Sequence, residues 1–231
     1  MPIHNINENP RHHRLARETL HIVTFGAEDK DAIVVGIRYL PVSKLILITM
    51  EGSKEAASIF AGRIGETLKL QTEVYEVRKP LLYNTLILFR EILEREGSRY
   101  EDIIVNVSSG DKQLSCAALT AAFINGLKTI AVDGNVPVLL PIVRMSYQDV
   151  ISDAKLNILK ALERAGGSVR DQTEMSKLTG YGKPLLSYHI NGSEDSKGLL
   201  ELGLVEISRK RGEGQMIRIT DIGRMLLAGI G

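Results

Sequence analysis

The chain of 231 residues is 44% hydrophobic and 25% charged, which is typical of a globular protein with one large or two modest domains. Its formal net charge of +1 excludes a global basic surface for nucleic acids, so any such role must rest on a local patch. The single cysteine, Cys116, excludes an intramolecular disulfide, and we expect it to be a small buried side chain on an apolar helix. No apolar run approaches the roughly 20 residues that span a bilayer, so we expect a cytoplasmic protein with no membrane partner.

After a polar start, the first part of the chain alternates short apolar strands with helices. Residues 1–18 hold three of the five histidines, and we interpret them as a flexible tail, although the pair His12 and His13 could bind a metal. Strands are predicted at 20–25, 44–49, 72–77, 103–107 and 127–133, with an edge strand at 135–142. Helices are predicted at 28–40, 54–70, 81–96 and from about 111 to 126. This alternation predicts an α/β, Rossmann-like fold, with helices on both faces of a mainly parallel sheet.

In such a sheet, ligands bind beyond the carboxyl ends of the strands, near a switch in strand order. The loops 24–27, 49–52, 108–113 and 133–135 all follow strands. The third leads into an alanine-rich helix, a geometry that points backbone N–H groups at an anion. Ser108 and Ser109 add hydroxyls, and Gly110 allows a close approach. Lys112 opposes the helix dipole, which a phosphate-bearing ligand would explain; the alternative is a capped turn with a solvated lysine.

Several common sites are excluded by what the sequence lacks. The first turn, TFGAEDKDA, has no G-x-G-x-x-G glycines, and no G-x-x-x-x-G-K-[ST] phosphate loop occurs. No cluster has zinc-ligand spacing, so no metal site is predicted. His21 is the only histidine between the tail and residue 188, and its strand position favours a structural role. We therefore predict no catalytic residues and no cofactor.

From Asp153 the pattern changes to three helices and a hairpin. Helices are predicted at 154–166 and 172–178, and a longer one from Lys183 toward Gly198. Strands at 204–208 and 216–220 are joined by a basic segment and followed by a helix at 221–228. This order is that of a winged helix-turn-helix domain.

The phrase GLLELGLVEI, followed later by RITDIGRMLL, resembles bacterial and archaeal winged-helix regulators. The resemblance covers residues 152–231 and implies that the helix from Lys183 enters the major groove of double-stranded DNA. The DNA-binding candidates are Lys183, Ser187, Tyr188, His189, Asn191, Arg209, Lys210 and Arg211. The alternatives are a solvated hairpin tip or a protein-binding module.

The N-terminal part resembles the CRISPR-associated Rossmann-fold (CARF) family, which carries an N/D-x-S/T-x-G-x-K-like turn after the fourth strand. The matching residues are Asn106-Val107-Ser108-Ser109-Gly110-Asp111-Lys112-Gln113, with Thr24-Phe25-Gly26 as a second motif. A CARF-like domain before a winged helix looks like the archaeal transcription regulators of subtype I-A CRISPR systems. That resemblance implies a homodimer that binds a cyclic oligoadenylate, such as cyclic tetra-adenylate, across its two-fold axis. The implied ligand-binding residues are Thr24, Phe25, Gly26, Asn106, Ser108, Ser109, Gly110, Asp111, Lys112 and Gln113.

We therefore predict a tail at 1–18, a CARF domain at 19–143, a linker at 144–152 and a winged helix-turn-helix domain at 153–231. The predicted function is regulation of CRISPR-associated genes in response to the ligand. Two alternatives stay open. One is a ring nuclease that cleaves the cyclic oligoadenylate, with Ser109 and Lys112 stabilising the phosphorane, although no general base is evident. The other is a scaffold that recruits the CRISPR interference complex.

Overall fold

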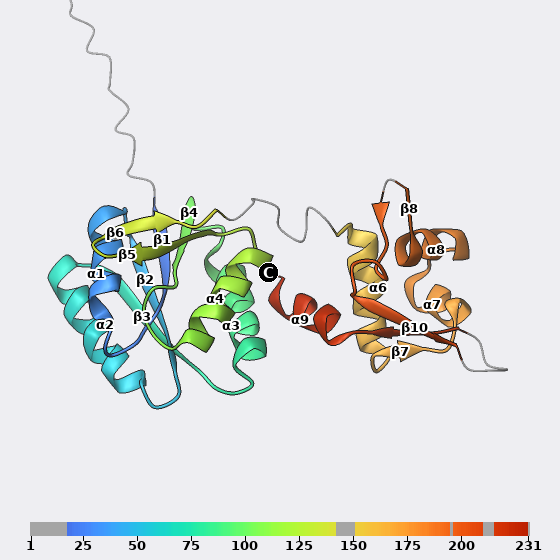
Figure 1. Cartoon of the computed structure of the whole chain (residues 1–231), viewed down its shortest axis with the longest axis horizontal. Helices are drawn as coiled ribbons and strands as arrows, with labels where there is room; N and C mark the ends of the chain where they lie inside the picture. The colour runs from blue at the N-terminus through green and yellow to red at the C-terminus, as the bar shows by residue number, and fades with distance from the viewer. Residues whose placement is uncertain (1–17, 142–150, 195, 210–214, 231) are drawn as a thin grey trace, which may run out of the picture.

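The computed structural model describes residues 18–141, 151–194, 196–209 and 215–230. An α/β half, residues 18–141, is followed by a half made of helices and short strands, residues 151–230 (Figure 1). The predicted tail at 1–18 and linker at 144–152 lie almost entirely outside the described residues. None of the helices in the described part combines the length and apolar character needed to cross a membrane.

The α/β half is built on a six-stranded sheet in the order β3-β2-β1-β4-β5-β6. The strands are β1 Thr19–Thr24, β2 Lys44–Met50, β3 Gln71–Val77, β4 Asp102–Asn106, β5 Lys128–Asp133 and β6 Val136–Leu139. All neighbours pair in parallel except β6, which is antiparallel to β5 at the sheet edge. The predicted mainly parallel sheet and its edge strand are confirmed, and Pro137 lies in that edge strand.

Helices cover both faces of this sheet, as predicted. They are α1 Lys30–Tyr39, α2 Lys54–Leu68, α3 Leu81–Glu96 and α4 Lys112–Ile124. Ile33 of α1 and Ala57 of α2 belong to the cluster on one face, and Leu86 of α3 and Leu114 of α4 to the cluster on the other. The central strands β1 and β2 are buried almost throughout, which explains their continuous apolar runs.

The C-terminal half contains helices around a three-stranded antiparallel sheet in the order β10-β11-β7. Its elements are α6 Asp153–Arg164, β7 Ser168–Val169, α7 Gln172–Thr179, α8 Lys183–Asn191, β8 Gly192–Ser193, β9 Ser196–Lys197, β10 Val205–Arg209, β11 Gln215–Ile219 and α9 Asp221–Gly229. Side-chain oxygens of Ser152, Asp171 and Thr220 accept backbone N–H groups at the starts of α6, α7 and α9, which fixes where these helices begin.

The helix predicted from Lys183 toward Gly198 is wrong in its second half, because α8 ends at Asn191. Gly192 follows with a φ of 89°, and β8 and β9 then form a small hairpin. Beyond it, the N–H groups of Leu199 and Leu200 donate to the carbonyls of His189 and Ile190. The chain therefore returns to the end of α8 after the hairpin.

The expectation that Cys116 is buried is also wrong, because the thiol is exposed. The helix α4 buries the side chains of Leu114, Ala117, Ala118 and Ala121. Cys116 lies outside this buried set, on the same exposed side as Thr120 and Phe123. The sequence does not reveal this exposed side, because the exposed residues of α4 after Gln113 carry no charge. The helix therefore appears apolar all round.

Candidate functional site

The strand order places β1 and β4 side by side at the point where it reverses. The chain leaves β1 for β2 on one side, and leaves β4 for β5 on the other. Loops that leave neighbouring parallel strands in opposite directions open a crevice at the carboxyl edge of the sheet. The two motifs singled out in the sequence, after β1 and after β4, meet at this edge.

Two glycines bring the two turns into contact. A Cβ atom on Gly26 would lie 2.6 Å from the Cα of Gly110, so the backbones touch where no side chain fits. Gly110 has a φ of 97°, in the region that favours glycine. The hydroxyl of Ser109 accepts the N–H of Gly26 at 3.0 Å and is itself buried. The contact between the β1 and β4 turns is therefore fixed by backbone and hydroxyl together.

Asn106, the last residue of β4, holds the β4 turn from beneath. Its buried amide donates from Nδ2 to the carbonyl of Ala32 in α1 at 3.2 Å and accepts the N–H of Ser108 at 3.0 Å. The Ser108 hydroxyl accepts the N–H of Val132 in β5 at 2.6 Å. Three elements thus converge on the start of this turn and fix its conformation.

The turn leaves a run of backbone donors without acceptors. The N–H groups of Ser109, Gly110, Asp111 and Lys112 donate to no acceptor among the described residues. The Asp111 carboxylate accepts the next N–H, that of Gln113, at 2.7 Å and caps α4. Consecutive unpaired N–H groups at a helix start are a binding site for an anion.

The side chains of Asp111, Lys112 and Gln113 are exposed beside these N–H groups. Lys112 makes no ion pair or hydrogen bond with any side chain in the part of the chain that the structure describes. The unpaired N–H groups and this ammonium form what we call the anion turn, residues 108–113. Asp111 adds a carboxylate to the same turn, so the positive charge of the anion turn is confined to the Lys112 ammonium and the N–H groups.

Other ligand candidates from the sequence are placed inward. The Phe25 ring is buried and packs on Phe60, with ring centroids 5.6 Å apart. The hydroxyl of Thr24 is buried and donates to the carbonyl of Asn106. Both side chains are therefore packed inside the fold, where they support the turn.

Two cations at the same edge were not singled out in the sequence. Arg78 and Lys79 follow β3 directly and line a cavity of about 480 Å³ at the ends of β2 and β3. Its other lining residues are Met50, Glu51, Val77 and Leu81. In the sequence, Arg78 and Lys79 are only a pair of cations between a predicted strand and Pro80, as in many polar loops. Their position at this edge becomes evident only when the strand order is known.

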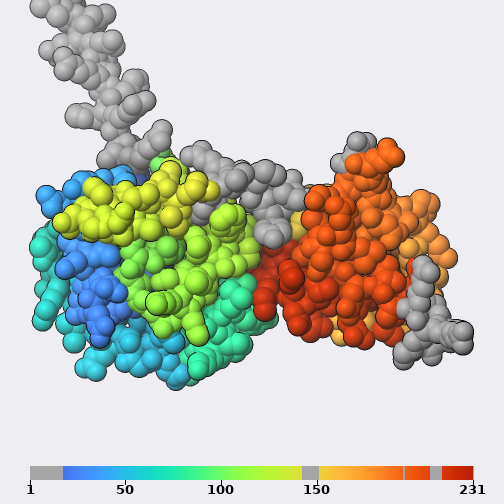
Figure 2. Space-filling model, in the orientation of Figure 1, coloured from blue at the N-terminus to red at the C-terminus, as the bar shows by residue number. Residues whose placement is uncertain are grey.

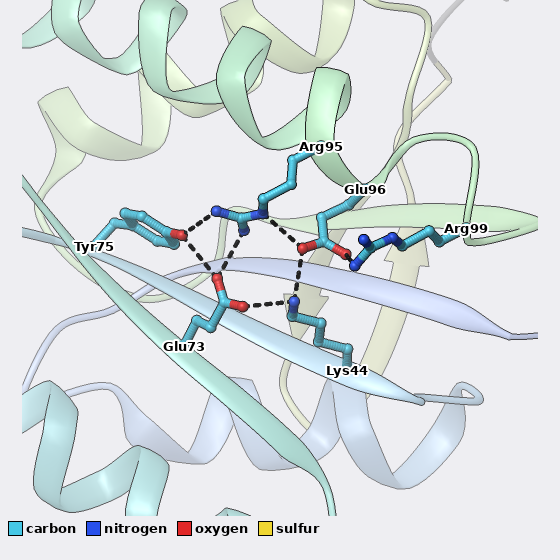
Figure 3. A network of polar contacts seen from close by, with 6 residues as sticks. All are labelled: Lys44, Glu73, Tyr75, Arg95, Glu96 and Arg99. Atoms are coloured by element: carbon cyan, nitrogen blue, oxygen red, sulfur yellow. Dashed lines mark hydrogen bonds and ion pairs between the residues drawn. The ribbon is translucent and has the colours of Figure 1, made fainter.

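A buried ionic network lies toward the opposite end of the sheet, where β2 begins (Figure 3). Lys44 contacts Glu73 at 2.6 Å and Glu96 at 2.8 Å, and Arg95 bridges the same two carboxylates. Burial alone would lower the pKa of Lys44, but hydrogen bonds to Glu73 and Glu96 outweigh it and raise that pKa. The network joins β2 and β3 to α3 and is remote from the anion turn.

The fold exposes some of the DNA-binding candidates on α8 and buries one of them. Lys183, Tyr188 and Asn191 are exposed on α8, and the Asn191 amide donates to the Ser187 hydroxyl at 2.9 Å. His189 is buried, so it does not lie on the exposed side of α8. Burial and the nearby charge of Lys155 lower the pKa of His189, and its Nδ1 has no partner among the described residues. The side chain of Arg209, and Lys210 and Arg211 entirely, lie outside the described residues.

The fold and this edge define an α/β protein with a Rossmann-like strand order and, at its switch point, a turn of backbone N–H groups without acceptors among the described residues. A family model described as "HFX_2341_N:-like, N-terminal" matches residues 19–134, about half of the chain. The chain belongs to that family. An uncharacterised protein of Archaeoglobus fulgidus is 26% identical over 203 residues, which cover 83% of this chain and 88% of that protein.

Among solved structures, Enterococcus italicus Csm6 bound to cyclic hexa-2'-fluoro-hexa-dAMP has a TM-score of 0.48 at 14% identity. Can2 from Sulfobacillus thermosulfidooxidans in complex with cyclic tetra-adenylate has a TM-score of 0.43 at 16% identity. The matches cover 65% and 91% of this chain, and the chain spans 48% and 63% of the lengths of those two proteins.

Proposed function

We propose that this protein is a ligand-responsive DNA-binding regulator of CRISPR-associated genes. Its CARF-like half binds a cyclic oligoadenylate, cyclic tetra-adenylate by preference, at the anion turn. Two copies associate so that the ligand lies across their two-fold axis. The C-terminal half acts as a winged helix-turn-helix domain that binds double-stranded DNA.

The observation that carries the ligand proposal is the set of N–H groups from Ser109 to Lys112, which, like the adjacent ammonium of Lys112, have no partner in the part of the chain that the structure describes. A phosphate accepts such hydrogen bonds and matches the charge of the lysine. A cyclic tetranucleotide has rotational symmetry and several phosphates, so a two-fold dimer would offer it two identical anion turns. One chain alone offers a single turn, which is a reason to expect the dimer.

The DNA proposal rests on the order of elements in the C-terminal half. The helices α6, α7 and α8 precede the antiparallel pair β10 and β11, which is the order of a winged helix. The helix α8 presents exposed polar side chains at Lys183, Tyr188 and Asn191. These residues, with the basic segment 209–211 of the sequence, are the proposed contacts to DNA.

The ligand proposal is tested by titrating the purified protein with cyclic tetra-adenylate in a calorimeter. We expect one ligand per two chains. The Lys112→Ala variant should bind at least about 10-fold more weakly, because a hydrogen bond to a charged group contributes about 1.5–3 kcal/mol and the dimer loses two lysines. Its unfolding temperature should match that of the wild type, since the Lys112 side chain is exposed and unpaired in the described structure.

Lys160→Ala is the matched control, because Lys160 is an exposed lysine with the same charge that lies in α6 of the C-terminal half, outside the anion turn. It should bind the ligand within about threefold of the wild type, as most exposed substitutions change little. Normal ligand binding by Lys112→Ala would mean that the turn is only structural. Ligand consumed over time would favour the ring-nuclease alternative.

A further inference from the structure

The first turn of α9 is fixed to the β10–β11 hairpin. Thr220, which follows β11, donates from its hydroxyl to the carbonyl of Gly203 at 2.7 Å, and its N–H donates to the carbonyl of Leu204 at 3.1 Å. A Cβ atom on Gly223 would lie 2.4 Å from that Leu204 carbonyl oxygen. Gly203 and Leu204 lead into β10, so the start of α9 is fixed at the end of the hairpin where β10 begins and β11 ends.

The last turn of α9 is fixed to the α/β half. Asn125, just after α4, donates from Nδ2 to the carbonyl of Gly229 at 2.7 Å and to the carbonyl of Ala121 at 2.9 Å. A Cβ atom on Gly229 would lie 3.0 Å from Leu86 in α3 and 3.4 Å from Ile124 in α4. Glycine weakens a helix relative to alanine, and here each glycine lies where α9 contacts another element closely. Figures 1 and 2 show α9, in red, between the two halves.

The contact between α9 and the α/β half is not filled. A groove of about 380 Å³ runs between α3, α4 and α9. Its lining residues are Leu82, Leu86, Leu119, Thr120, Phe123, Ile124, Ile222, Met225 and Leu226. An apolar contact with free volume can repack without compressing the core, as helices do when they slide past one another in conformational changes.

We infer that α9 transmits ligand occupancy from the anion turn to the β10–β11 hairpin. The anion turn lies at the start of α4, and Asn125 lies at its end, so a shift of this helix moves the carbonyl contact at Gly229. The helix α9 then carries that shift to Gly203 and Leu204. This inference rests on the proposed function for its ligand, cyclic tetra-adenylate, and goes beyond it by naming Asn125 and α9 as the coupling elements.

The test uses the isosteric variant Asn125→Asp, which replaces the donor of both hydrogen bonds with an oxygen. Ligand affinity and DNA affinity are each measured alone, and DNA affinity is then measured at saturating cyclic tetra-adenylate with a mixed-sequence duplex. In the wild type we expect the ligand to change DNA affinity by about 10-fold. In Asn125→Asp each separate affinity should stay within about threefold, while the effect of the ligand on DNA affinity falls below about twofold.

Asn84→Asp is the matched control, because the Asn84 amide makes the same kind of bond, from Nδ2 to the carbonyl of Arg78, and that acceptor lies outside α9. It should keep the full ligand effect. A full effect in Asn125→Asp would overturn the inference, provided that circular dichroism shows both variants folded.

A second measurement does not depend on the ligand. Hydrogen exchange of free Asn125→Asp should be faster than wild type in α9 and in β10–β11, although the substitution lies at the end of α4. Unchanged exchange in these elements would also overturn the inference. If wild type binds no cyclic tetra-adenylate, the ligand proposal fails, and this exchange measurement still decides whether α9 joins the two halves.

Discussion

At the residue scale, the contacts of Asn106 explain why this chain has an amide at the start of the motif after β4. Its Nδ2 donates to Ala32 while its Oδ1 accepts from Ser108, so one side chain needs both a donor and an acceptor. A carboxylate would place an oxygen against the carbonyl of Ala32. Gly36 approaches the same amide so closely that a Cβ atom would lie 2.8 Å from Nδ2. The amide therefore has a structural role beneath the anion turn, and only the exposed part of the motif is available to the proposed ligand.

His21 makes the stability of the fold sensitive to acid. It is buried in β1, and its Nε2 contacts the carbonyl of Pro41 at 2.9 Å. Burial lowers its pKa from 6.5 to about 4, although the Pro41 carbonyl acts in the other direction. Because the unfolded chain takes up the proton first, stability should fall as the pH drops from 6.5 toward 4. The loss attributable to His21 should reach about 3 kcal/mol, at about 1.4 kcal/mol for each pH unit.

The measurement is urea unfolding at several pH values for the wild type and for His21→Leu. His189 titrates in the same direction, so only the difference between the two proteins reports on His21. Above pH 6.5 that difference should be constant. A difference that also stays constant between pH 6.5 and 4 would contradict a buried neutral His21.

At the element scale, the network of Figure 3 attaches α3 to β2 and β3, so its loss should destabilise the whole α/β half. Lys44→Met removes the cation between Glu73 and Glu96 and leaves the buried Glu96 with fewer partners. Breaking one side of a buried ion pair costs about 3–5 kcal/mol, and we expect a loss of that size in urea unfolding.

Arg78→Ala provides the comparison, because it breaks the pair of Arg78 with Glu51, whose side chains are 71% and 66% exposed. Exposed pairs contribute about 0–1 kcal/mol. If Lys44→Met cost as little as Arg78→Ala, the network would not be holding α3. The double variant Lys44→Met with Glu96→Gln should recover part of the loss, since it removes the uncompensated buried charge.

Also at the element scale, the sequence predicted most strands and helices within one to three residues of their ends. The reason is that a continuous apolar run, as in β2, and apolar residues with a period of 3.6, as in α3, report burial directly. The prediction failed where contacts between residues far apart in the sequence determine the path of the chain. The return of the chain after Asn191 is fixed by the carbonyls of His189 and Ile190, and the amide of Asn125 reaches Gly229, 104 residues away. Local patterns contain no information about such pairs.

At the scale of the whole molecule, charge limits how DNA is bound. The chain has 29 lysines and arginines against 28 acidic residues, so no general positive field attracts a polyanion. Any affinity for DNA must come from a few cations placed on one surface. The largest effects of single substitutions should therefore occur at α8 and in the segment 209–211.

Lys183→Ala tests this surface. Lys183 is the exposed first residue of α8, and we expect it to contact a DNA phosphate. Its loss should weaken binding to a mixed-sequence duplex by about 3- to 10-fold at low salt. It should also reduce the slope of log K against log salt by about 1 for each lysine lost, because fewer counterions are released. Fluorescence anisotropy over a salt series measures both quantities.

Lys54→Ala is the control, since Lys54 is the exposed first residue of α2 in the α/β half and has the same charge and helix position. It should leave both the affinity and the slope unchanged. An equal effect of Lys54→Ala would mean that DNA binds the α/β half or the molecule as a whole. Wild-type protein with no salt-dependent affinity for DNA would leave α8 as a protein-binding surface, because counterion release accompanies any phosphate contact made by its lysine.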